Sequence, residues 1–232
     1  MDRLHRTRLL FGDTTTEKLR TATVMVVGCG AVGSFAIEAL ARTGIGHIIV
    51  VDFDMVEESN INRQLFALDS TVGMAKVDVA TARIHDINPN THVTAYNIRW
   101  DGATELDVRP DFVIDAIDDV PAKVALYKWC ASHNIPFISS MGAALKMDVT
   151  QIKIAPISRT TVCPLAGRVR RAVRELNLPD FPVVFSTERP APVSGHAKNM
   201  GSNVTVTGTF GLMLANFVIR NTIECAAICA RK

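Results

Sequence analysis

A glycine-rich turn is the first feature of this chain that is suited to chemistry. The apolar run 23–27 leads into residues 28–33 (GCGAVG), in which the first glycine allows a tight turn, the second lets a phosphate approach the backbone and the third permits close helix packing. Unpaired N–H groups at the start of the following helix favour an anion. We predict a nucleotide site on Gly28, Gly30 and Gly33, with a purely structural turn as the alternative.

Acidic and donor side chains follow the next apolar run, residues 48–51. Asp52 comes directly after it, where an acid accepts hydrogen bonds from a ribose, although a turn or helix cap is the alternative. Asp54, two residues further on, is also assigned to the nucleotide site. Amide, guanidinium and ammonium donors follow on Asn60, Arg63, Gln64 and Lys76. Singly they are ordinary surface residues, but together they suit the charge that develops on the α-phosphate and pyrophosphate of ATP. We therefore expect Arg63 and Lys76 to be catalytic.

A second acidic cluster, residues 115–119 (DAIDD), follows the apolar run 112–114. A carboxylate at a strand end that faces a triphosphate is well placed to bind Mg²⁺, and we assign Asp118 to this role. The alternative is that Asp118 or Asp119 caps the helix that follows. A cap and a metal ligand can be neighbours in the sequence.

Strand-like and helical patterns alternate through the first two thirds of the chain. Strands are expected at residues 23–27, 47–51, 91–96, 111–115 and 135–139, and helices at 32–42, 76–87 and 122–133. Apolar, β-branched strands alternating with helices are typical of a mostly parallel sheet covered on both faces. We predict a doubly wound, Rossmann-like α/β fold in a single domain spanning 1–232.

Residues 143–232 are expected to form a substrate-side extension of this domain. The pattern predicts strands at 150–155 and 181–185, helices at 164–176 and 204–219, and an irregular segment over 186–202, interpreted as an active-site loop or crossover. The helix 164–176 carries Arg168, Arg170, Arg171 and Arg174. These arginines suit nucleic-acid phosphates, or they form a solvated charged face.

Composition narrows the class of protein. With 232 residues that are 48% hydrophobic, the chain can bury one large core, and a net charge of +2 gives no general basic field. Five cysteines without a C-x-x-C pair favour a reducing compartment and argue against a structural zinc site. Residues 1–6 lack the apolar run of a signal peptide, and 204–219 is too polar for a membrane span. We expect a cytoplasmic protein without a membrane partner.

These motifs resemble the ubiquitin-activating-enzyme-like adenylyltransferase superfamily, which includes activators of the molybdopterin and thiamine sulfur-carrier proteins. The resemblance is carried by residues 28–33, 52–54, 60–64, Lys76 and 115–119. It implies ATP on the glycine turn, its ribose on Asp52 and Mg²⁺ on Asp118. The segment 3–6 (RLHR) is similar to the family's R-x-x-R, which implies a homodimer in which Arg6 reaches the phosphates of the partner subunit.

Residues 39–46 and 161–166 are similar to the branch of tRNA threonylcarbamoyladenosine dehydratases. In that branch the carboxylate of a threonylcarbamoyl group on an anticodon-adjacent adenosine attacks the α-phosphate, and intramolecular attack on the acyl-adenylate closes a ring and releases AMP. Cys163 is then either a nucleophile or a small apolar residue at a helix start. The alternatives are activation of a ubiquitin-like sulfur-carrier protein, whose enzymes commonly hold zinc through two C-x-x-C pairs, and a nicotinamide-dependent oxidoreductase, which the cluster 60–76 disfavours.

Overall fold

A computed structural model describes residues 2–192 and 200–229 of the protein, with side chains up to residue 223. The described residues form a seven-stranded sheet in the order β3-β2-β1-β4-β5-β7-β6, in which every neighbouring pair is parallel except the antiparallel pair of β6 and β7. The strands are β1 (Thr23–Val27), β2 (His47–Asp52), β3 (His92–Asn97), β4 (Phe112–Asp115), β5 (Phe137–Ser140), β6 (Ile152–Pro156) and β7 (Pro182–Ser186). The predicted doubly wound α/β fold is confirmed.

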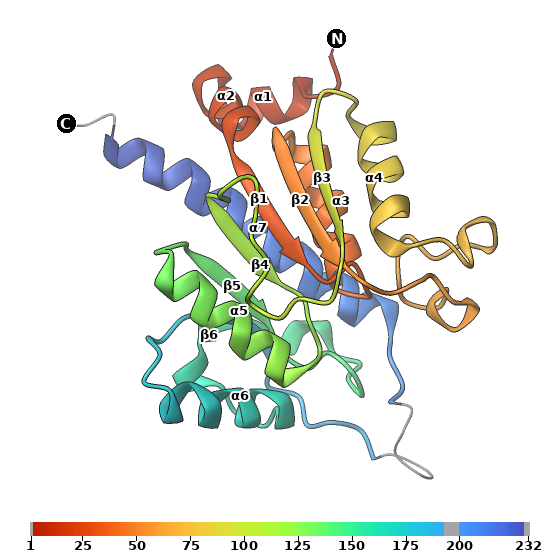
Figure 1. Cartoon of the computed structure of the whole chain (residues 1–232), viewed down its shortest axis with the longest axis vertical. Helices are drawn as coiled ribbons and strands as arrows, with labels where there is room; N and C mark the ends of the chain where they lie inside the picture. The colour runs from red at the N-terminus through yellow and green to blue at the C-terminus, as the bar shows by residue number, and fades with distance from the viewer. Residues whose placement is uncertain (1, 193–199, 230–232) are drawn as a thin grey trace.

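Helices cover both faces of this sheet (Figure 1). The α-helices are α1 (His5–Phe11), α2 (Asp13–Thr21), α3 (Gly33–Thr43), α4 (Lys76–Ile87), α5 (Val120–Ser132), α6 (Pro164–Glu175) and α7 (Val204–Cys229). Short 3₁₀ turns are η1 (Glu58–Asn60), η2 (Asp69–Thr71), η3 (Val149–Gln151) and η4 (Ile157–Arg159). Figure 1 shows α3 and α7 on one face and α5 on the other.

Alternate residues of the central strands pack into cores on opposite faces of the sheet. In β1, Val24 and Val26 belong to the core covered by α3, α4 and α7, whereas Met25 and Val27 belong to the core covered by α5. Each fully buried side chain of this size contributes about 1.5–3 kcal/mol to stability. Burial on both faces explains why these strands are continuous apolar runs instead of alternating patterns.

The parallel register brings the ends of the central strands to one level. Val27 of β1 lies opposite both Val51 of β2 and Asp115 of β4. The residues that follow, Gly28, Asp52 and Ala116, therefore meet at the same edge of the sheet. This edge is where the sequence places its polar motifs.

The last third of the chain continues the same sheet. β7 pairs with β5, and β6 forms the edge strand beside β7, to which it is antiparallel. The helix predicted at 204–219 is confirmed in α7, which continues to Cys229. Val206, Phe210, Leu214 and Val218 of this helix are buried at helical spacing. None of the described helices is both long and apolar enough to span a membrane.

Apart from shifts at the ends of elements, two further parts of the sequence prediction differ from the structure. α1 and α2 were not predicted, because α1 buries no residue and α2 buries only Thr16 and Leu19, which leaves no apolar period to detect. The irregular segment expected over 186–202 begins one residue later, because Ser186 belongs to β7. Residues 193–199 of that segment lie outside the described part of the chain.

Candidate active site

The carboxyl ends of β1, β2, β4 and β5 border a cleft of about 1000 Å³. Strand order reverses here, since β2 lies on one side of β1 and β4 on the other, and such a switch point is where open α/β sheets bind ligands. Predicted residues that line the cleft are Gly28, Gly30, Asp52, Asp54, Asn60, Arg63, Gln64, Lys76, Asp118, Cys163 and Arg168. The structure thus gathers most of the predicted site.

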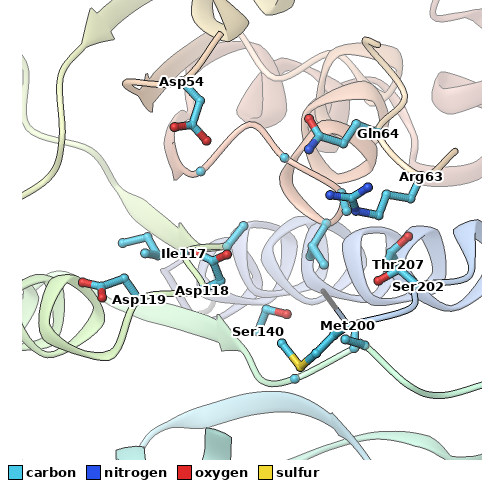
Figure 2. Close-up of a pocket in the computed structure, with 18 of the residues that line it drawn as sticks. Asp54, Arg63, Gln64, Ile117, Asp118, Asp119, Ser140, Met200, Ser202 and Thr207 are labelled. Carbon is cyan, nitrogen blue, oxygen red and sulfur yellow. The ribbon is translucent and has the colours of Figure 1, made fainter. Parts of the chain in front are cut away.

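The cleft has two walls. We define the first wall as the glycine turn with the lining residues of 52–76, and the second wall as those of 140–146, 163–168 and 200–207. The second wall is held together by the close approach of Gly142 to Cys163 and by the hydrogen bond from Leu145 to Gly201. Figure 2 shows Arg63 and Gln64 on one side of the cleft and Ser140 and Met200 on the other. A ligand in this cleft is therefore held between the nucleotide motif on the first wall and the last third of the chain on the second wall.

The glycine turn has the geometry that the motif predicts. Gly28 has φ +98°, and a Cβ added to it would lie 2.7 Å from the carbonyl oxygen of Ala116. A Cβ on Gly33 would lie 1.7 Å from the carbonyl oxygen of Gly28, so only glycine allows the backbone of the turn to pack this closely. Gly33 does not line the cleft. Gly30 does line it, where an added Cβ would meet only Gln64 Nε2, at 3.8 Å. Space for a ligand is therefore left at Gly30.

Asp52 ties the glycine turn to the end of β2. Its Oδ2 accepts a hydrogen bond of 2.6 Å from the Cys29 N–H, and its Oδ1 accepts one of 2.9 Å from the Asp54 N–H. A carboxylate offers about four acceptor positions, so lone pairs remain for a ribose hydroxyl. Burial raises the pKa of the Cys29 thiol, which disfavours its thiolate form.

Lys76 is not a free cation. It is the first residue of α4, its side chain is buried, and its Nζ lies 2.7 Å from Oδ2 of Asp54, whose side chain is 47% exposed. The sequence predicted both residues for the nucleotide site but not their pairing. Since an ammonium has three N–H donors, two remain for a ligand.

The donors of residues 58–64 project from a tight turn. Asn60 is buried, and its Oδ1 accepts a hydrogen bond of 3.2 Å from the Glu57 N–H. Arg63 Nη1 donates to the Ser59 carbonyl oxygen at 2.7 Å and to Asn62 Oδ1 at 2.8 Å. These bonds hold Arg63 at the cleft and leave its other guanidinium donors for a ligand.

Asp118 and Asp119 divide the two roles that the sequence left open. Asp119 caps α5, because its Oδ2 accepts a hydrogen bond of 3.0 Å from the Ala122 N–H. Asp118 lines the cleft and makes no hydrogen bond or ion pair with any other described residue. Its carboxylate is therefore available to a cation.

A buried ion pair beneath the cleft was not predicted from the sequence. Lys123 and Asp115 are fully buried, and Lys123 Nζ donates to Asp115 Oδ2 at 2.7 Å and to the Ser140 carbonyl oxygen at 2.8 Å. Asp115 Oδ1 accepts from the Ile117 N–H at 3.0 Å, which fixes the turn that carries Asp118. The signal for this pair was Lys123 itself, a charged residue with apolar neighbours on α5. Removing either partner would leave an uncompensated buried charge.

Cys163 lies on the second wall, immediately before α6. It is 5% exposed, and its Sγ is 3.2 Å from the position that a Cβ on Gly142 would take. Lys146 is a further cleft residue that the sequence did not single out. Its place in the loop after β5 was the available signal, because polar residues after parallel strands gather at this edge.

Arg6 lies away from the cleft. It is an exposed residue of α1, which Figure 1 shows near the amino ends of the central strands, whereas the cleft is at their carboxyl ends. A contribution of Arg6 to this chain's own cleft is inconsistent with that position. A contribution to a second subunit is not.

The predicted tRNA arginines of α6 differ in their surroundings. Arg168, Arg171 and Arg174 are exposed, and Arg168 also lines the cleft. Arg170 is half-buried, and its Nη1 donates to the Thr160 carbonyl oxygen at 2.6 Å. Arg170 is therefore less accessible to a nucleic acid than the other three arginines.

Comparison with known proteins gives consistent results. The family model described as the ThiF family matches residues 4–228. The chain is 41% identical over 238 residues to the tRNA threonylcarbamoyladenosine dehydratase of Bacillus subtilis, and this alignment covers 94% of each protein. It is also 38% identical over 134 residues to the molybdopterin-synthase adenylyltransferase of Salmonella typhimurium, and this alignment covers 57% of this chain and 53% of that protein.

A solved structure extends the comparison to three dimensions. The crystal structure of E. coli tRNA N6-threonylcarbamoyladenosine dehydratase in complex with ATP has a TM-score of 0.90 and 35% sequence identity, and the alignment covers 97% of this chain and 95% of that one. The family model, the sequence match and the structural match each cover most of this chain. This protein belongs to the ThiF family.

Proposed function

We propose that this protein is an ATP-dependent tRNA threonylcarbamoyladenosine dehydratase of the cytoplasm. The observation that carries the proposal is the extent of the sequence match, which covers 94% of this chain for a dehydratase and 57% for a molybdopterin-synthase adenylyltransferase. The dehydratase match leaves only about 6% of the chain uncovered, so it extends into the segments that form the second wall of the cleft. That wall is where a substrate other than ATP would bind.

In the first step, a carboxylate oxygen of the threonylcarbamoyl group attacks the α-phosphorus of ATP. The bond from that phosphorus to the bridging oxygen breaks, and pyrophosphate leaves with the electron pair. Lys76, held by Asp54, and Arg63, held by Ser59, supply preorganised donors on the first wall. Donors in such positions stabilise negative charge that grows in the transition state.

In the second step, a nucleophilic atom of the same threonylcarbamoyl group attacks the acyl carbon and loses its proton to solvent. The bond from that carbon to AMP breaks, and AMP leaves with the electron pair. Because the reaction is intramolecular, no thioester is needed to hold the intermediate. Cys163 on the second wall is the candidate nucleophile for a covalent route.

The residues present fit a magnesium ion. Asp118 is a carboxylate in the cleft without a protein partner in the described structure, and no group of three or more His, Cys, Asp or Glu residues gathers there or elsewhere in the described residues. Mg²⁺ is usually held by one or two carboxylates together with substrate phosphates and water, so a single carboxylate suits it. Bound there, the ion would neutralise charge on the phosphates.

We infer that the active unit is a homodimer. Arg6 is exposed on α1 and distant from its own cleft, so it can act only in the cleft of a partner subunit. We further infer that Arg168, Arg171 and Arg174 contact tRNA phosphates, because they extend from the rim of the cleft along the exposed side of α6.

A sulfur-carrier protein is the alternative substrate. Both reactions begin with an attack on the α-phosphate, so pyrophosphate release alone does not distinguish them. The substrate that causes this release does distinguish them. We would incubate the protein with ATP and Mg²⁺ together with threonylcarbamoyl-modified tRNA, unmodified tRNA or a sulfur-carrier protein. The proposal expects pyrophosphate release with modified tRNA alone. Release with only the carrier protein would establish the alternative.

A further inference from the structure

A buried lysine of the second wall has donors that the protein does not use. Lys146 is 3% exposed, lines the cleft and donates one hydrogen bond, of 2.5 Å, from Nζ to the Glu188 carbonyl oxygen. Among the described residues it has no other hydrogen bond and no ion pair. An ammonium has three N–H donors, and leaving a buried charge without an anion is costly. Burial lowers the pKa of Lys146, although Cys163 and Glu188 act in the opposite direction.

The backbone on both sides of Lys146 is fixed. The Glu188 carboxylate accepts hydrogen bonds of 3.0 Å from the N–H groups of Met147 and Asp148. Leu145 donates its N–H to the Gly201 carbonyl oxygen at 2.9 Å and has φ +61°, a conformation that is rare for a bulky residue. The loop therefore holds Lys146 in one position at the cleft.

The position of Lys146 relative to the phosphate-binding donors indicates which anion it meets. Lys76 and Arg63 are on the first wall with the glycine turn, whereas Lys146 is on the second wall with Cys163. ATP on the first wall leaves the second wall to the group that attacks it. In the proposed reaction that group is a carboxylate, which complements a buried ammonium with free donors.

We propose that Lys146 binds the carboxylate of the threonylcarbamoyl group and positions it for attack on the α-phosphate. This inference rests on the proposed function. After the attack, the same group contains the acyl carbonyl oxygen, which carries the negative charge while the ring closes and before the bond to AMP breaks. An ammonium beside that oxygen stabilises this charge as well.

Binding of modified and unmodified RNA tests the proposal without turnover. We would measure the affinity of anticodon stem–loop RNA with and without the threonylcarbamoyl group, in the presence of a non-hydrolysable ATP analogue. The wild-type protein should prefer the modified RNA by about tenfold or more, as expected for one hydrogen bond to a charged group. Lys146→Met should lose this preference and keep its affinity for ATP and for unmodified RNA, and Lys146→Arg should recover part of it.

Matched variants keep the outcomes distinct. Lys153→Met removes an exposed lysine of β6 and should behave as wild type. Retention of the full preference by Lys146→Met would overturn the inference. If Lys146→Met fails to fold, Lys146→Arg decides, because loss of the preference in a folded, positively charged variant would overturn the proposed role. The proposed function itself would be refuted if the wild-type protein does not prefer modified RNA and also forms no AMP when it is incubated with ATP and that RNA.

Discussion

Lys76 and Asp54 form an ion pair on the first wall of the cleft, with Nζ of Lys76 2.7 Å from Oδ2 of Asp54. A second contact joins the same residues, because the Lys76 N–H donates to the Asp54 carbonyl oxygen at 3.0 Å. Asp54 therefore determines where the ammonium lies. The ion pair converts a flexible side chain into a fixed donor beside the glycine turn.

The first prediction separates the two members of this pair. Lys76→Met should reduce adenylyl transfer by at least about a hundredfold, the scale for removing one donor that stabilises a transition state. Asp54→Asn should reduce it less, by about tenfold, because the amide oxygen can still accept from Lys76 but no longer attracts its charge. The measurement is pyrophosphate release at saturating ATP. Lys128→Met, an exposed position on α5, is the control, and unchanged turnover in Lys76→Met would refute the phosphate site.

The second prediction concerns magnesium and compares neighbouring aspartates. Asp118→Asn should lose most of its magnesium-dependent activity while its thermal unfolding is unchanged, because Asp118 has no partner in the described structure. Asp119→Asn should retain the magnesium dependence and lose about 1 kcal/mol of stability at most, since asparagine is also a good cap of α5. Magnesium titrations of both variants check this. Equal magnesium responses in the two variants would contradict the assignment.

The third prediction tests whether Arg6 acts in the partner subunit. Arg6→Ala and Lys76→Ala should each be inactive alone, and mixing them should restore part of the activity, because one of the two hybrid clefts keeps both groups. Arg20→Ala, an exposed arginine of α2 that pairs with Glu17, is the control and should be active alone. No recovery in verified heterodimers would show that Arg6 does not act in trans.

The fourth prediction distinguishes the arginines of α6. Replacing Arg168, Arg171 and Arg174 with glutamine should weaken tRNA binding and reduce its salt dependence by roughly one unit of slope per lost phosphate contact, with ATP affinity unchanged. Arg170→Gln should instead lower the melting temperature, because it loses its hydrogen bond to Thr160. Binding measured across a salt series gives both slopes. Superimposable slopes for wild type and the triple variant would identify these arginines as solvated charge.

The sequence predicted the sheet well because each central strand is buried on both faces. β1 and α4 have the predicted bounds, and the other strands differ by one or two residues at their ends. The helices α1 and α2 were missed because few of their residues are buried, so the sequence carries no apolar period there. Local pattern was informative only where the core constrains it.

The residue types of the site were predictable, but their pairings were not. Gly28, Asp52 and Asp118 follow strands, and parallel strands bring their carboxyl ends together. The pairing of Lys76 with Asp54, and of Lys123 with Asp115, depends on side-chain distances that no local pattern contains. Lys146 was missed for the same reason, because its importance comes from burial and unused donors instead of from a motif.

The mass of the modified nucleoside shows whether the protein dehydrates threonylcarbamoyl-modified tRNA. We would incubate the protein with ATP, Mg²⁺ and threonylcarbamoyl-modified tRNA, digest the tRNA to nucleosides, and measure the mass of the modified adenosine together with the AMP released. We expect the nucleoside to lose the mass of one water molecule for each AMP formed. An unchanged nucleoside mass, with wild-type protein that still adenylates a sulfur-carrier protein, would contradict it.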